Sequence, residues 1–131
     1  MKKKNTLLLF LCLFRLWAVA QEKKPVKIAC VGNSITYGYT IENRERDSYP
    51  AQLQRMLGEG YTVGNFGKSG ATLLNKGHRP YMKQEEFQKA LAFAGDIVVI
   101  HLGINDTDPR NWPDYRDFFV RDYLALIDSF R

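Results

Sequence analysis

Apolar residues in this chain form short continuous runs and longer periodic segments, which predict strands and helices respectively. The continuous runs predict three strands, at 26–31, 61–65 and 97–100. Apolar positions three or four residues apart predict three helices, at 49–57, 84–93 and 119–131. This alternating order is typical of an α/β fold with helices on the faces of a parallel sheet. The strand at 97–100 is apolar at every position, so we expect it near the centre of that sheet.

The helix that follows Ser48 has the clearest boundary signals. Ser48 is the predicted N-cap, Pro50 lies in the first turn, and Gly58 ends the helix. The residues predicted to form its apolar face are Tyr49, Leu53, Met56 and Leu57. The glycine-rich segments between the predicted elements, at 32–47, 66–80 and 103–113, are expected to be loops.

Each predicted strand is followed by a loop whose residues suit acyl transfer. Ser34 follows the first strand, Gly70 follows the second and Asn105 follows the third. The carboxyl ends of parallel strands meet at one edge of a sheet, so the three loops are expected to converge. A serine that attacks an ester creates an oxyanion, which requires two or three preset N–H donors. The backbone N–H groups of Ser34 and Gly70 and the Asn105 amide would supply them. Alternatively, Ser34 is only the N-cap of the next helix.

Three blocks in this order resemble the SGNH (GDSL-like) hydrolase superfamily. They are Gly32-Asn33-Ser34-Ile35, Gly70, and Gly103-Ile104-Asn105-Asp106, and the resemblance extends from about Lys27 to the end of the chain. It implies a three-layer αβα, flavodoxin-like fold, with Ser34 as nucleophile and Gly70 and Asn105 as oxyanion donors. We expect residues 21–131 to be the amino-terminal part of such a domain, incomplete at the C-terminus.

Asn33 replaces the aspartate that is more usual in the first block. This variant is similar to secreted bacterial carbohydrate and sialate O-acetylesterases. The resemblance implies a serine esterase that removes O-acetyl groups from a carbohydrate through an acyl-serine intermediate, without a cofactor or metal. It also suggests that Asn33 and Asp106 contact the substrate.

The general base is the main departure from the family pattern. The family's last block, Asp-x-x-His, supplies the histidine that deprotonates the serine. His78 and His101 are the histidines here, and neither has an aspartate three positions earlier. We expect His78 to be solvated and His101 to be packed, with the missing block downstream of Arg131. The chain alone is then expected to hydrolyse esters poorly, and the alternative is an inactive fragment that at most binds a sugar.

The first twenty residues predict a secretory signal peptide. Lys2-Lys3-Lys4 precedes an apolar stretch at 7–19, and Ala18-Val19-Ala20 is a cleavage sequence, although Arg15 interrupts the stretch. Cleavage after Ala20 would give a secreted or periplasmic protein without a membrane span.

Charge and motif matching exclude several other functions. The chain has 19 basic and 14 acidic residues, but four of the basic residues lie in the predicted signal peptide, which leaves 15 against 14. This balance argues against a nucleic-acid partner.

Gly67-Lys68-Ser69 resembles the end of a phosphate-binding loop, but position 62 is Thr rather than the required glycine. No cluster of residues has metal-ligand spacing, and Cys30 is expected to be a small buried residue.

Overall fold

The computed structural model describes residues 24–131, so the predicted signal peptide lies outside the described residues. Its three strands are β1 (Val26–Gly32), β2 (Tyr61–Gly67) and β3 (Ile97–His101). All pair in parallel in the order β2-β1-β3. The α/β fold with a parallel sheet is therefore confirmed.

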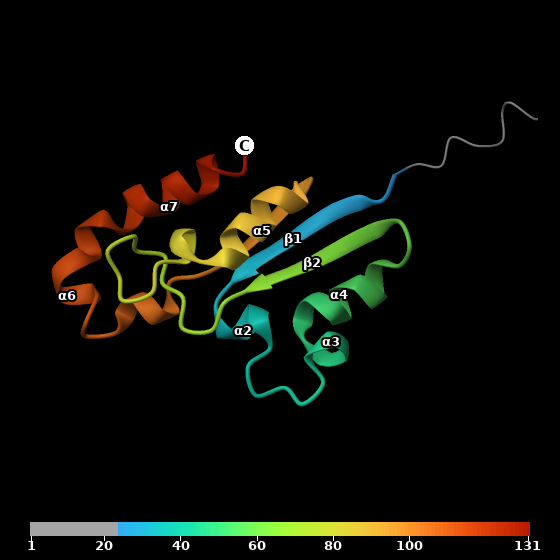
Figure 1. Ribbon diagram of the computed structural model, residues 1–131, viewed down its shortest axis with the longest axis horizontal. Helices are drawn as coiled ribbons and strands as arrows, with labels where there is room; N and C mark the ends of the chain where they lie inside the picture. The colour runs from blue at the N-terminus through green and yellow to red at the C-terminus, as the bar shows by residue number, and fades with distance from the viewer. Residues whose placement is uncertain (1–23) are drawn as a thin grey trace, which may run out of the picture.

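Helices lie on both faces of this sheet. They are α2 (Ser34–Tyr37), α3 (Arg44–Asp47), α4 (Tyr49–Leu57), α5 (Glu85–Phe93), α6 (Trp112–Tyr115) and α7 (Phe119–Asp128). Short 3₁₀ turns occur at η1 (Tyr81–Lys83), η2 (Ile104–Thr107) and η3 (Arg116–Phe118). Figure 1 shows α3 and α4 on one side of the β1–β2 pair, with α5 and α7 on the other side. The predicted long helices are present, whereas the segment at 32–47, predicted to be a loop, contains α2 and α3.

β1 is the central strand of the described sheet, because it has a parallel neighbour on each side. Its residues from Ala29 to Val31 are fully buried. Among the described strands β3 pairs only with β1, so the strand at 97–100, expected near the centre, lies at the edge of the described sheet. Alternate residues of β3 are exposed, including Ile97 and Val99. The helices on that face, α2 and α4, pack against β1 and β2 instead.

The main hydrophobic core lies between the sheet, α5 and α7. Its buried members are Val31, Ala71, Leu73, Tyr81, Phe87, Ala90 and Leu126. The predicted apolar face of α4 is only partly buried, since Met56 is 83% exposed. Periodicity indicates which face of a helix is apolar, but not how far the sheet extends beneath it. Met56 therefore lies outside the surface through which α4 packs against β2.

Two glycines allow α2 to sit directly on the ends of the strands. A Cβ atom at Gly67 would lie 2.1 Å from the backbone nitrogen of Tyr37. A Cβ atom at Gly32 would lie 2.0 Å from Oγ1 of Thr36. Only a residue without a side chain permits this approach. The two glycines therefore hold the first turn of α2, which contains Ser34, at the carboxyl ends of β1 and β2.

Candidate functional site

Ser34 is the first residue of α2, two residues beyond the end of β1. The N-cap of this helix is Asn33, whose Oδ1 accepts a hydrogen bond from the Ile35 N–H at 3.0 Å. The alternative that Ser34 is the N-cap was therefore wrong, because Asn33 occupies that position. Ser34 is half-buried, and its hydroxyl makes no hydrogen bond to another described residue. Its side chain is therefore not committed to a local structural contact.

The loop after β2 is held against the end of β1 and folds back on itself. The Lys68 N–H donates to the carbonyl of Gly32 at 2.8 Å, two residues before Ser34. Gly70 has a φ of +77°, a conformation that favours glycine. Further along, the Thr72 N–H donates to the carbonyl of Arg79 at 2.8 Å. The loop is therefore ordered by its own backbone, with Gly70 at a turn near its start.

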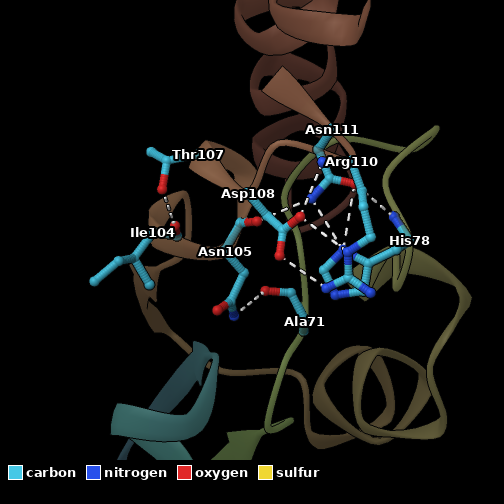
Figure 2. Close-up of polar contacts among 8 residues, drawn as sticks. All are labelled: Ala71, His78, Ile104, Asn105, Thr107, Asp108, Arg110 and Asn111. Carbon is cyan, nitrogen blue, oxygen red and sulfur yellow. Dashed lines mark hydrogen bonds and ion pairs between the residues drawn. The ribbon is translucent and has the colours of Figure 1, made fainter. Parts of the chain in front are cut away.

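Asn105 joins the loop after β3 to the loop after β2. It lies in η2, and its Nδ2 donates to the carbonyl oxygen of Ala71 at 2.8 Å (Figure 2). Because a primary amide has two N–H groups, one donor of Asn105 remains outside this bond. Ala71 follows Gly70 directly, so two of the predicted oxyanion donors belong to adjoining parts of one bonded structure.

Asp106 makes a second tie between the same loops. Its two carboxylate oxygens accept hydrogen bonds from the N–H groups of Leu73, at 2.9 Å, and Leu74, at 2.7 Å. The side chain is fully buried, and this burial raises the pKa of Asp106, while the two backbone N–H groups act in the opposite direction. The carboxylate thus has a structural role. Asn33 is also fully buried, and the predicted contacts of these two residues with substrate stay predictions.

Neither described histidine ring is hydrogen-bonded to Ser34. His78 is exposed, as expected, and its backbone N–H and its ring Nδ1 both contact Asn111. His101 was expected to be packed, but it is exposed at the end of β3, on the same open face as Val99. No hydrogen bond joins either ring to Ser34 within residues 24–131.

Asn111 is the residue of this region that sequence reasoning missed. It lies in the segment at 103–113, which was predicted to be a loop, and it precedes α6. The side chain is fully buried, and its Nδ2 donates to the carbonyl oxygen of Asn105 at 2.9 Å. An asparagine before a Trp-Pro pair indicates the start of a helix at most. Nothing in the local pattern indicates this contact with Asn105.

Two other features of the described chain bear on its chemistry. Residues 24–131 contain no group of three or more side chains that could hold a metal ion, and no helix long and apolar enough to cross a bilayer.

Cys30 is buried as predicted, and burial raises the pKa of its thiol. This thiol is therefore protonated and shielded, and it is not a candidate nucleophile.

Comparison with known sequences identifies the family. A sequence model of the GDSL-like lipase/acylhydrolase family matches residues 30–131, which include all three candidate loops. The chain belongs to this family. An acetylxylan esterase of Xylanibacter ruminicola is 48% identical to it over 112 residues, or 86% of this chain. The chain spans 23% of the length of that relative.

Solved structures from the same family share the fold. Two structures of the SGNH-hydrolase family esterase AlinE4, one of them a point mutant, superpose with a TM-score of 0.55 at 22% sequence identity. The match covers 81% of this chain and 55% of the AlinE4 chain. The described residues thus share part of the α/β architecture of AlinE4.

Proposed function

We propose that this chain carries the nucleophile and the oxyanion donors of a serine esterase that removes acetyl groups from a carbohydrate. The observation that carries the proposal is the 2.8 Å hydrogen bond from Asn105 Nδ2 to the Ala71 carbonyl. It links the loop after β3 to the loop after β2, which the Lys68–Gly32 bond in turn links to the end of β1. The three loops that contain the blocks resembling the family are therefore bonded into one unit.

The proposed reaction uses Ser34 as the attacking group. Its Oγ forms a bond to the carbonyl carbon of the ester while its proton passes to a base, and the carbonyl oxygen becomes an oxyanion. Backbone N–H groups of Ser34 and Gly70 and the free N–H of Asn105 donate to that oxygen. The sugar hydroxyl leaves with a proton, and water then releases acetate from the acyl-serine. No cofactor enters this sequence of steps.

The base in this scheme follows from the family resemblance. The family assigns the role to the histidine of an Asp-x-x-His block, and residues 24–131 contain no such block. The acetyl group and the carbohydrate are supported by the similarity to an acetylxylan esterase. The absence of a hydrogen bond from either described histidine ring to Ser34 favours a second candidate function, an inactive chain that binds a sugar.

Replacing Ser34 distinguishes these two functions. In the complete protein, Ser34→Ala should abolish labelling by a serine-directed phosphonate and reduce hydrolysis of p-nitrophenyl acetate and acetylated xylan by about three orders of magnitude or more. Ser69→Ala, in the neighbouring loop, is the matched control and should be labelled normally. Undiminished labelling of Ser34→Ala would exclude this serine as the nucleophile. A wild-type protein that binds acetylated xylan without hydrolysing it would support the second function.

A further inference from the structure

We propose that Asn111 is a positioning residue that orients the oxyanion donor of Asn105. This inference rests on the proposed function, which it extends beyond the family's conserved blocks. Asn111 is fully buried at the start of α6, so its side chain does not reach a substrate. Its effect on catalysis must therefore pass through its neighbours.

Hydrogen bonds around Asn111 form a closed circuit between the two donor loops, of which Figure 2 shows the bonds among Asn111, Asn105, Ala71 and His78. Asn111 Nδ2 donates to the Asn105 carbonyl at 2.9 Å, and Asn105 Nδ2 donates to the Ala71 carbonyl at 2.8 Å. On the other side, the His78 N–H donates to Asn111 Oδ1 at 2.9 Å. The chain itself completes the circuit. Arg79 follows His78, and its carbonyl accepts a hydrogen bond from the N–H of Thr72, the residue after Ala71.

Both ends of the Asn111 amide take part in this circuit. One Nδ2–H group donates to the Asn105 carbonyl, and Oδ1 accepts from the His78 backbone N–H. The ring nitrogen Nδ1 of His78 lies 3.0 Å from Nδ2 and 3.3 Å from Oδ1 of the same amide. This buried amide has one stable orientation, since a flip would place its oxygen against the Asn105 carbonyl oxygen and its nitrogen against the His78 N–H. Asn111 is therefore a rigid support for the backbone of Asn105.

Asn105 is restrained at two points as a result. Asn111 holds its backbone carbonyl, and the Ala71 carbonyl holds one N–H of its side chain. These two restraints set the direction of the remaining side-chain N–H group. An oxyanion forms only during the reaction, so a misdirected donor lowers kcat much more than it raises KM.

The substitution Asn111→Asp tests this role at constant shape. The carboxylate keeps an acceptor for the His78 N–H but loses both donors and places an oxygen against the Asn105 carbonyl. In the complete protein, kcat should fall about 10- to 100-fold while KM changes less than about twofold. The matched control is Arg110→Ala, because exposed Arg110 bonds only Asp108 and not the circuit. The control should retain wild-type kcat.

The double variant separates positioning from simple loss of stability. If Asn111 acts through Asn105, then Asn111→Asp should have little further effect on kcat in an Asn105→Ala background. A purely structural role predicts the same fractional loss of activity in both backgrounds, and that result would overturn the proposal.

A measurement that is independent of activity is the hydrogen exchange of the Asn105 side-chain amide, followed by NMR. Exchange should accelerate about tenfold or more in Asn111→Asp and stay unchanged in Arg110→Ala. Unchanged exchange in Asn111→Asp would contradict the proposal even if the esterase assignment holds. If Ser34→Ala instead hydrolyses esters as fast as the wild type, that result contradicts the esterase assignment alone. If Asn111→Asp does not fold, Asn111→Ser replaces it in both measurements.

Discussion

Asn105 and Asp106 are adjacent residues whose side chains serve different purposes in the same loop junction. Asn105 uses one side-chain N–H group to bind the Ala71 carbonyl and has a second N–H outside this bond, whereas both oxygens of Asp106 are occupied by backbone N–H groups. This division explains how one short turn can both hold two loops together and present a donor. It also gives each residue a distinct expected phenotype.

Replacing Asn105 with alanine removes the proposed side-chain donor. In the complete protein, Asn105→Ala should lower kcat about 10²–10³-fold with a much smaller change in KM. Steady-state kinetics and a melting curve from the same preparation test this. A lower melting temperature with normal turnover per folded molecule would show that Asn105 only holds the loop.

Replacing Asp106 with asparagine should act on stability instead. The new amide nitrogen would face a backbone N–H group, which leaves a buried donor without an acceptor and should lower the free energy of unfolding by about 1–3 kcal/mol. Because burial raises the pKa of Asp106 above its unfolded value, the wild type's stability advantage should be largest below about pH 4 and shrink as the pH rises through the folded pKa. Urea unfolding of both proteins from pH 4 to pH 7 measures this difference. If the wild type's stability advantage instead grows with pH, the hydrogen bonds from Leu73 and Leu74 lower the pKa of Asp106 more than burial raises it.

At the scale of secondary-structure elements, the placement of α2 on the strand ends is what presents Ser34. Four residues form too short a helix to be stable alone, so tertiary contacts must hold it. Those contacts depend on Gly32, which faces the Thr36 side chain, and on Gly67, which faces the Tyr37 backbone, both too closely for a Cβ atom. The glycines are therefore part of the site, although they do no chemistry.

Adding one methyl group at Gly67 should disturb this arrangement. The clash in Gly67→Ala is with backbone atoms of Tyr37, which cannot rotate away, so the free energy of unfolding should fall by about 1–3 kcal/mol or more. Gly60→Ala is the matched control, because a Cβ atom there meets no other atom within 4 Å. Its stability should remain within about 0.5 kcal/mol of the wild type. Equal urea midpoints for the two variants would show that α2 tolerates displacement.

At the scale of the whole molecule, the described sheet is covered unevenly. One face of β3 packs toward α7, while Ile97, Val99 and His101 on the other face are exposed. In the described chain β3 also has only one neighbouring strand. An apolar, unpaired edge of this kind promotes association between chains.

Replacing Val99 tests whether this face drives self-association of the chain. Val99→Thr keeps a β-branched side chain but adds a hydroxyl, so sedimentation velocity should show less association with little loss of stability. Val98→Thr is the control, because Val98 packs against the core and its replacement should lower the free energy of unfolding by about 1–3 kcal/mol. Unchanged association of Val99→Thr would mean that another surface is responsible.

The sequence alone determined the features that depend on local physics. Apolar runs and helical spacing located all three strands and the helices α4, α5 and α7, because these signals arise within one element. The order of strands and helices then implied a parallel sheet. The three loops of the candidate site followed from the rule that parallel strands end at one edge.

Only the tertiary structure decided which groups in those loops hold one another. The bond from Asn105 to Ala71 joins residues 34 positions apart, and the bonds from Asp106 span 33 and 32 positions. It also decided that β3 lies at the edge of the described sheet and that Asn33, not Ser34, caps α2. Strand order, burial and the partners of a buried amide depend on residues distant in the chain, and periodicity within one segment carries no information about them.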